Sequence, residues 1–153
     1  MGVEERLSEL GLELPPPPKP VASYVPVSVT GSLAFVAGQV PAVDGEVVHP
    51  GHVGAEVTAA QAKDSAKRAA LQALSALRDA LGGFERLVRI VKVEVFVASA
   101  PGFTEQPLVA NGASDLLVEV LGEAGRHARA AVGVAELPLN ASVEVALVAE
   151  IVP

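Results

Sequence analysis

The sequence predicts a single α+β domain in which two helices pack on one face of a mixed β-sheet. Apolar residues recur with a helical period in two long segments and alternate with polar residues in several shorter ones. In chain order these segments are a hairpin, a helix, a strand, a second helix and two strands. Strands that alternate with helices in this way are typical of one sheet whose helices lie on the same side.

The composition limits the kinds of function that this chain can have. Its 153 residues fit one domain with a substantial core, and with only 3% aromatic residues that core must be mostly Ala, Val and Leu. The net charge of −7 argues against a nucleic-acid-binding surface, which requires clustered Lys and Arg. The absence of cysteine excludes disulfides, thiolate metal sites and a cysteine nucleophile.

The sequence also gives an expectation for the compartment. The N-terminus has acidic residues where a signal peptide has basic ones, and no apolar region follows it. No uncharged run approaches the roughly 20 residues that a membrane-spanning helix needs. We therefore expect a cytoplasmic protein that makes no membrane contact, and the lack of cysteine is compatible with that compartment.

Residues 1–20 are expected to form an extension that precedes the compact domain of residues 21–153. Apolar residues at helical spacing predict a short helix over residues 3–10. The proline run at residues 15–20 favours an extended polyproline conformation. Such a run can recruit a partner module, but the flanking sequence favours a stiff connector.

The compact domain is expected to begin with a β-hairpin. Residues 24–29 and 33–37 have strand character and flank a Gly-Ser turn. Gly38 stands at the end of the second strand, before Pro41, which cannot donate to a sheet ladder. At such a position the backbone can approach other groups closely. Residues 40–57 are predicted to be a loop with room for a short strand at 46–48.

Two helices follow from the spacing of small and apolar residues. Thr58 is a suitable N-cap for a helix over residues 59–81, whose stripe of mostly alanine side chains lets a sheet approach closely. A second helix is predicted to begin at Thr104 or Gln106 and to end near Leu121.

Three strands complete the predicted sheet, at residues 87–98, 126–138 and 142–151. In the first of them Val91 is expected to share the core face with the next three alternate valines, with Lys92, Glu94 and Phe96 on the other face. In the last, Glu144 lies mid-strand on the less apolar face. Because no element of the chain is left to cover that half-polar face, we expect an oligomer with sites between subunits.

Arg129 lies within a long apolar run of the strand at residues 126–138. Its guanidinium carries five donors in a rigid fork that suits a carboxylate. One interpretation is that the side chain ends at the surface or pairs with an acid. The other is that it anchors a ligand.

Several segments of the chain resemble the Rid proteins, also called the YjgF family and named for reactive intermediate deaminase activity. The matching segments follow the family's order and spacing over about residues 21–152. The most specific is the C-terminal combination of an arginine strand that ends in Leu-Pro and a glutamate six residues after that proline. The segments are Tyr24-Val25, Ala37-Gly38-Gln39-Val40-Pro41, Ala60-Gln61-Ala62, Val91–Val97, Asn111, Arg129–Pro138 and Val143-Glu144-Val145.

The resemblance implies a homotrimer of chorismate-mutase-like subunits with three clefts between them. In family members that act as deaminases, an arginine binds the carboxylate of a 2-imino or 2-enamino acid, and water releases a 2-oxo acid and ammonium. The resemblance implies neither a metal nor an organic cofactor. It assigns the catalytic positions to Arg129 and Glu144 and the other substrate-binding positions to Tyr24, Gly38 and Asn111.

These assignments agree with the chemistry of the residue types, although each has a structural alternative. A bidentate arginine would fix a small carboxylate, and Glu144 could orient or deprotonate the attacking water. Glu144 could instead form a salt bridge to an arginine, and Asn111 could satisfy a helix backbone. Tyr24 could close the pocket or only pack in an interface.

The three histidines are expected to have no metal-binding role. His49 and His52 lie three residues apart in a Pro/Gly loop, but no third ligand is apparent. His127 could line the cleft beside Arg129.

The sequence departs from the deaminating members at two positions. Ala131 stands where many of them have a cysteine, and Ala37 where they have a serine before Gly-Gln. Both changes make the expected pocket more apolar, which favours a different or larger ligand side chain. The segments 111–115 and 125–129 are closer to a less characterised branch.

Three functions therefore compete at the level of the sequence. The first is an imine deaminase, and the second is a non-catalytic binder of small carboxylates. The third is an endoribonuclease or translation inhibitor, the L-PSP label that some relatives carry; the acidic charge and scarce aromatic residues oppose this function.

Overall fold

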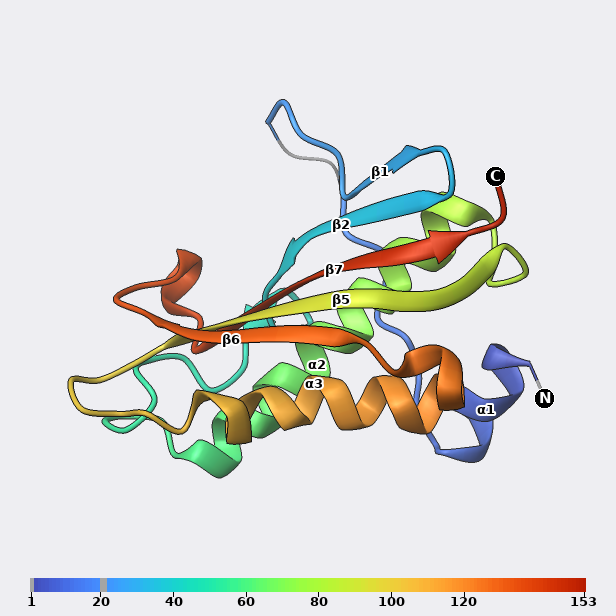
Figure 1. The fold of residues 1–153 in the computed structure, drawn as a ribbon. Helices are drawn as coiled ribbons and strands as arrows, with labels where there is room; N and C mark the ends of the chain where they lie inside the picture. The colour runs from blue at the N-terminus through green and yellow to red at the C-terminus, as the bar shows by residue number, and fades with distance from the viewer. Residues whose placement is uncertain (1, 20–21) are drawn as a thin grey trace.

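The computed structural model describes residues 2–19 and 22–153, and it has the predicted α+β architecture. Helices α2 and α3 lie side by side on one face of a five-stranded sheet (Figure 1). The elements are α1 Val3–Glu9, β1 Val27–Thr30, β2 Leu33–Gln39, β3 Ala42–Val43, β4 Glu46–Val47, α2 Ala59–Leu81, β5 Leu87–Ala98, α3 Gln106–Leu121, the 3-10 helices η1 Gly122–Gly125 and η2 Pro138–Asn140, β6 Ala128–Val134 and β7 Val143–Ile151.

The sheet is mixed, with the strand order β1-β2-β7-β5-β6. Strands β5 and β6 are parallel because α3 carries the chain back along the sheet between them, whereas the other neighbouring pairs are antiparallel. Strand β6 is thus an edge strand, and α3 lies beside it. This arrangement determines where Arg129 points.

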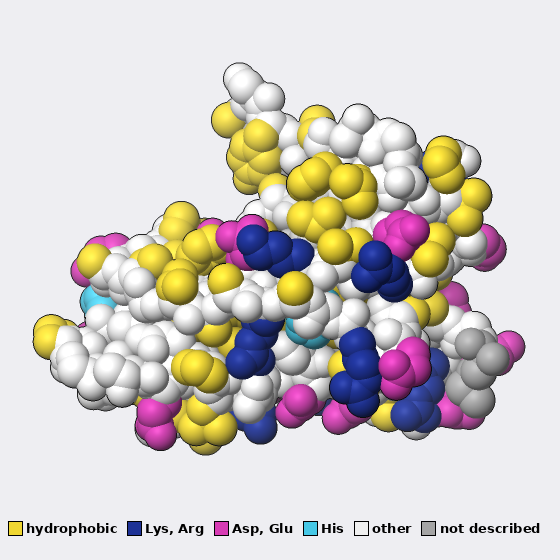
Figure 2. Space-filling model, in the orientation of Figure 1, with side chains coloured by type: hydrophobic (Ala, Val, Ile, Leu, Met, Phe, Trp, Pro, Cys, Tyr) yellow, Lys and Arg dark blue, Asp and Glu magenta, His cyan; other side chains and the backbone are white. Residues whose placement is uncertain are grey.

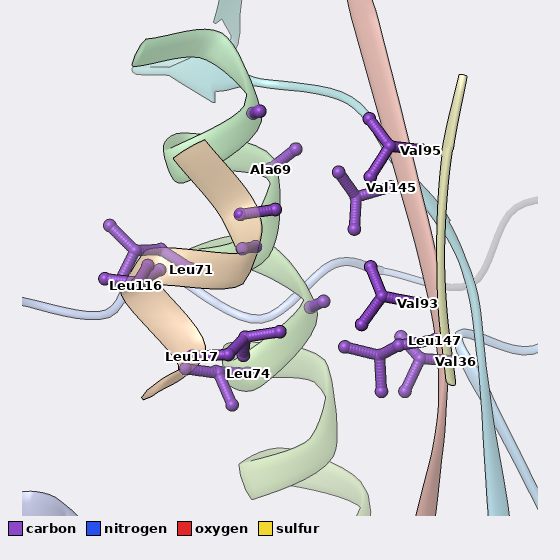
Figure 3. Packing of buried hydrophobic residues seen from close by; sticks show 14 of the residues in the cluster. Val36, Ala69, Leu71, Leu74, Val93, Val95, Leu116, Leu117, Val145 and Leu147 are labelled. Carbon is purple, nitrogen blue, oxygen red and sulfur yellow. The ribbon is translucent and has the colours of Figure 1, made fainter. Parts of the chain in front are cut away.

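Helix α2 begins as the sequence predicts, at Thr58. The Thr58 hydroxyl accepts a hydrogen bond from the Gln61 backbone, and the Gln61 side chain accepts one from the Thr58 backbone, which forms a complete capping box. The alanine stripe of α2 is fully buried and brings the helix close to the sheet. Figure 3 shows Leu74 of α2 and Leu117 of α3 facing valines of β5 and β7.

Helix α3 packs closely against α2 at Gly112. A Cβ atom at this position would collide with the backbone carbonyl of Lys63 in α2, so only glycine allows this approach. The contact fixes the position of α3, which carries Asn111 and Ser114 of the candidate site.

Two strand predictions are wrong in detail. Strand β1 begins at Val27 instead of Tyr24, because Pro26 has no amide hydrogen for the ladder, and Tyr24 is exposed before the strand. In β5 the register with β7 shifts between Ile90 and Lys92, so that Ile90 enters the core in place of Val91. A bulge of this kind leaves no clear signal in a run of β-branched residues.

The arginine strand is also shorter than predicted. Strand β6 covers Ala128–Val134 and not residues 126–138, because η1 holds the chain before it and Pro138 begins η2. The loop at residues 40–57 contains the short hairpin of β3 and β4. The second helix begins at Gln106, which was one of its two predicted starts.

The N-terminal segment is packed along α2 in the structure. Leu7 is only 3% exposed and belongs to the same core cluster as the sheet residues. The Ser75 hydroxyl and the Gln72 amide, both in α2, donate to the carbonyl oxygens of Pro15 at 2.5 Å and Pro16 at 3.0 Å. The segment that the sequence suggests as a connector thus has fixed contacts with the helix layer.

The face of the sheet opposite α2 and α3, called the open face below, carries no helix among residues 2–19 and 22–153. Phe35 and Val132 point to this side and are each a little under half exposed, at 44% and 45%. Hydrophobic and charged side chains are mixed on the surface that Figure 2 shows. Within the described ranges, no helix has the length and hydrophobicity to cross a membrane.

Candidate functional site

Arg129 points to the helix side of the sheet. In β6 it is in register with Val93 of β5, whose side chain is fully buried beneath the helices. Residues in register on neighbouring strands share a face of the sheet. Because β6 is the edge strand, the arginine side chain reaches α3 and remains exposed to solvent there.

Helix α3 holds the guanidinium of Arg129 with three hydrogen bonds. The Nη1 group donates to Asn111 Oδ1 at 2.8 Å and to Ser114 Oγ at 3.2 Å, and Nη2 donates to the Pro107 carbonyl at 3.4 Å. An arginine has five N–H donors, so the Nε hydrogen and one Nη2 hydrogen have no acceptor among the described residues. These two groups form the edge that a carboxylate binds in a bidentate manner.

Among the described residues, no acid forms an ion pair with Arg129. Its neighbour Arg126 is paired with Glu123 at 3.0 Å, and Glu150 pairs with Arg89 at 2.6 Å. Of the two parts of the alternative interpretation, pairing with an acid is thus not supported by these contacts, whereas a position at the surface agrees with the exposure of Arg129. The arginine is oriented by neutral groups and keeps its positive charge available.

Ser114 and His127 extend the polar group around Arg129. The Ser114 hydroxyl is 2.9 Å from Nε2 of His127, and Nδ1 of the same ring is 2.6 Å from the Gly125 carbonyl. The sequence suggested that His127 could line a cleft beside Arg129, but it indicated no role for Ser114. Its signal was the spacing from Asn111, since residues three apart lie on the same side of a helix.

Glu144 lies on the open face of the sheet, on the side opposite Arg129. It is in register with Phe96 of β5 and alternates along β7 with buried residues. The carboxyl group is half-buried, and this burial raises its pKa. Its side chain has no hydrogen bond to any of the described residues.

Gly38 makes room for Glu144. The register between β2 and β7 shifts between Val36 and Gln39, and this irregularity brings the glycine under the acid. A Cβ atom at Gly38 would lie 2.7 Å from Oε2 and 2.8 Å from the carboxyl carbon of Glu144. The close approach that the sequence suggested for Gly38 is therefore made to this carboxylate.

Tyr24 and Gly38 line one cleft of about 720 Å³. The cleft lies between the proline-rich segment, α2 and the loop that follows β2, and Tyr24 is 54% exposed in it. Glu144 is not among the residues that line this cleft, and Gly38 alone of the two contacts it, so Gly38 and Glu144 form one group, which we call the glutamate half. Arg129, Asn111, Ser114 and His127 form the other, the arginine half.

A single chain does not bring the two halves together. The arginine half lies on the helix side at the β6 edge, whereas Glu144 lies on the open face of a central strand. A site that uses both Arg129 and Glu144 therefore needs a second copy of the chain.

The other two histidines are engaged in local contacts. The ring of His49 lies 3.2 Å from Asp64. Burial would raise the pKa of Asp64, but Arg68 and His49 together outweigh it, so that this pKa is lowered. The ring of His52 lies 2.9 Å from the Ala135 carbonyl and 3.1 Å from Glu136, and the carbonyl, followed by that carboxylate, raises the pKa of His52. In the part of the chain that the structure describes, no three His, Asp or Glu side chains are grouped as metal ligands.

Comparison with known proteins identifies the family. The model of a family described as "YjgF/chorismate_mutase-like, putative endoribonuclease" matches residues 4–151. The chain belongs to this family. The match confirms the resemblance found in the sequence and extends it to the N-terminal segment, and the solved structures of the YjgF family share the α+β fold.

Individual YjgF relatives are similar over almost their whole length. Protein TCP17 of Trypanosoma cruzi is 45% identical over 150 residues, which cover 97% of this chain and 94% of that protein. The structure of Atu1372 from Agrobacterium tumefaciens, whose function is unknown, is 47% identical with a TM-score of 0.91, and the match covers 97% of this chain and 92% of the other. TdcF of E. coli, solved with bound serine, is 25% identical with a TM-score of 0.61 over 88% of this chain and 92% of TdcF.

Proposed function

We propose that the protein hydrolyses small 2-imino and 2-enamino acids to 2-oxo acids and ammonium, in clefts between the subunits of a homotrimer. The observation that carries this proposal is Arg129, which is held by α3 with two donors directed at no group of the described chain. A small α-carboxylate fits that pair of donors.

The positions of the two halves support an oligomeric site. If the open face of one subunit meets the β6 edge of the next, then Glu144 of one copy approaches Arg129 of another. Such a contact joins two different surfaces, and contacts of this kind form a ring when the rotation between neighbouring subunits closes. The exposed Phe35 and Val132 on the open face would be buried in this interface. The resemblance to Rid proteins adds the expectation that the ring has three members.

The reaction needs one anchor and one group that moves protons. Arg129 binds the substrate carboxylate and thereby fixes the position of the imine carbon. Glu144 accepts a proton from water as the water oxygen bonds to that carbon. Starting from the iminium form of the substrate, this addition gives a neutral carbinolamine, and the protonated acid returns the proton to its nitrogen. The C–N bond then breaks as the hydroxyl oxygen forms the carbonyl, and the hydroxyl proton passes through Glu144 to the departing ammonia, so that a 2-oxo acid and ammonium leave. A carboxyl group with a raised pKa suits both steps.

The remaining predicted residues have supporting roles in this proposal. Asn111 orients Arg129, and Gly38 leaves room for the carboxyl group of Glu144. The exposed Tyr24 would close the cleft between subunits and supply a hydroxyl. Serine, which is bound in the structure of TdcF, carries the same α-carboxylate as the proposed substrates. No step of the reaction uses a metal or an organic cofactor.

A coupled assay tests the deaminase proposal. A dehydratase that releases 2-aminoacrylate from serine supplies the substrate, and the appearance of pyruvate is followed with and without the purified protein. We expect faster pyruvate formation with the wild type and no acceleration with Arg129→Ala. Equal rates with and without the wild-type protein would exclude this function.

A second candidate function is that of a non-catalytic trimeric binder of small carboxylates. Ala37 and Ala131 favour it, because they remove polar groups that deaminating relatives place near the pocket. Calorimetric titration with pyruvate distinguishes the two. If the wild-type protein binds pyruvate, Arg129→Ala abolishes this binding, and the wild type shows no turnover in the coupled assay, the function is that of a binding protein.

The family description and several relatives carry the name endoribonuclease, so RNA cleavage is a third candidate. The net charge of −7 opposes an RNA-binding surface. RNA cleavage that co-purifies with the protein and disappears in Glu144→Gln would support this third function.

A further inference from the structure

A chain of hydrogen bonds leads from the candidate ligand anchor into the protein. It runs from Arg129 Nη1 to Ser114 Oγ at 3.2 Å, from Ser114 to Nε2 of His127 at 2.9 Å, and from Nδ1 of His127 to the Gly125 carbonyl at 2.6 Å. Four groups from α3, η1 and the β6 region thus form one continuous path, and His127 is its titratable member.

The donors and acceptors fix the direction of this path. The Gly125 carbonyl can only accept, so Nδ1 of His127 carries a hydrogen, and in the neutral ring Nε2 is then an acceptor. The Ser114 hydroxyl must therefore donate to Nε2. Its oxygen in turn accepts the hydrogen of Arg129 Nη1. With neutral His127, the hydroxyl hydrogen of Ser114 is directed away from any ligand on Arg129.

Protonation of His127 reverses one bond of the path. Because Nδ1 already holds a hydrogen, the added proton goes to Nε2, which then donates to Ser114. The hydroxyl hydrogen of Ser114 is released, and the imidazolium adds a positive charge close to the guanidinium. The added positive charge favours an anion on Arg129, and histidine side chains in general change charge between about pH 5 and pH 8.

We infer that Ser114 and His127 belong to the carboxylate site and that carboxylate binding at Arg129 is coupled to proton uptake by His127. By linkage the effect is reciprocal, so that a bound carboxylate favours the protonated ring. The inference rests on the proposed role of Arg129 as an anion anchor, but it does not depend on deamination. In this arrangement both are positioning residues, since they act on the ligand through Arg129.

The other charged groups near His127 are on α3, η1, the start of β6 and β5. Arg126 and Glu123 neutralise each other, and Lys92 is in register with Ala128 and points to the open face. Asp115 and Glu119 of α3 are exposed and form no ion pair with His127 among the described residues. Arg129 is therefore the charged group that is connected to the ring by hydrogen bonds.

Calorimetry of the full-length protein with pyruvate tests this coupling. Titrations at about pH 6 and about pH 8 are each made in two buffers that differ in ionisation enthalpy, which gives the number of protons taken up. We expect binding to be on the order of fivefold tighter at the lower pH, the lower end of usual coupling strengths, with net proton uptake.

Three variants separate the path from general effects. His127→Gln retains hydrogen-bonding groups but cannot take up a proton, so affinity should lose its pH dependence and the uptake should vanish. Ser114→Ala should uncouple the ring from the ligand, and Ser114→Thr, which restores the hydroxyl, should recover the coupling. His49→Gln is the matched control, because that ring contacts Asp64 instead, and it should behave as the wild type. Thermal unfolding of each variant shows that it is folded.

The outcomes distinguish this inference from the proposed function. Proton uptake that persists in folded His127→Gln would overturn the coupling and leave the deaminase proposal intact. If His127→Gln abolishes the proton uptake but the wild-type protein shows no turnover in the coupled assay, the coupling is supported and the deaminase proposal is rejected. The absence of pyruvate binding by the folded wild-type protein would overturn both.

Discussion

The arginine half and the glutamate half of the candidate site are prepared in opposite ways. Arg129 donates three hydrogen bonds to neutral groups of α3, which orient it and leave its charge uncompensated. Glu144 is half-buried against Gly38, has no hydrogen-bond partner among the described residues, and has a raised pKa because of burial.

This difference matches the roles that the proposed function gives to the two groups, which are ligand binding for Arg129 and proton transfer for Glu144. An anchor works best when its geometry is fixed before the ligand arrives, since less entropy is then lost on binding. A group that accepts and returns a proton works best when its pKa lies near the working pH, which requires that its charged form is not strongly stabilised. In the proposed function, the arginine half therefore binds the substrate and the glutamate half transfers the protons.

Removal of the anchor should have the largest effect. Arg129→Ala deletes the charged fork, and we expect kcat/KM for the imino acid to fall on the order of 10³-fold, as for loss of a bidentate charged contact. Arg129→Lys keeps the charge but not the fork, so its loss should be smaller. Steady-state kinetics in the coupled assay measure both. Equal activity of Arg129→Ala and wild type would remove Arg129 from the site.

Mixing two inactive variants should restore activity if the halves meet across subunits. Arg129→Ala retains the glutamate half, and Glu144→Gln retains the arginine half. When the two variants are unfolded together and reassembled in equal amounts, about one inter-subunit cleft in four would receive both intact halves, so activity should return to about a quarter of the wild-type value.

The double variant Arg129→Ala/Glu144→Gln, mixed with wild type, controls for reassembly in the same experiment. Its subunits lack both halves, so it can only dilute intact clefts. Failure of the two single variants to recover activity, in material that has reassembled, would show that one subunit supplies both groups or that the two do not cooperate.

A change at Gly38 should damage the glutamate half alone. In Gly38→Ala the new Cβ would lie 2.7 Å from Glu144 Oε2, so the end of that flexible side chain must move. We expect kcat to fall roughly 10- to 100-fold, part of the usual contribution of a positioned general base, while pyruvate affinity at Arg129 stays near the wild-type value. Kinetics and calorimetry together measure this separation, and an equal loss of kcat and affinity would contradict it.

The sequence was sufficient for those parts of the fold that depend on local periodicity. The capping box at Thr58, the alanine stripe of α2 and the alternation in β7 each have a direct local cause, and the structure has them where they were predicted. The bulge that exchanges Ile90 for Val91 was missed, because both residues have the same strand preference and only the pairing with β7 decides between them.

The site was predictable as a set of residue types but not as an arrangement. The alternation in β7 predicted Glu144 on the less apolar face of its strand, and the structure has it there. The side that Arg129 faces could not be predicted in the same way, because it depends on the register of parallel β6 against β5. Ser114 was missed for a related reason. Its role appears only when α3 lies beside the edge strand and brings its hydroxyl to the guanidinium.

The smallest predicted effect concerns stability and again separates the halves. Since burial raises the pKa of Glu144 in the folded state, the folded protein holds this proton more tightly than the unfolded chain. The stability linked to Glu144 is therefore fully present below the pKa of the unfolded state and is lost as the pH rises through the raised value. Glu144→Gln, which never ionises, should unfold at a higher temperature than the wild type at neutral pH, and this difference should shrink in acid. Thermal unfolding at several pH values measures it. Glu94→Gln, the same change on the same open face, controls for the removal of one negative charge, and an equal pH-dependent gain in both variants would mean that general surface charge, not the burial of Glu144, is responsible.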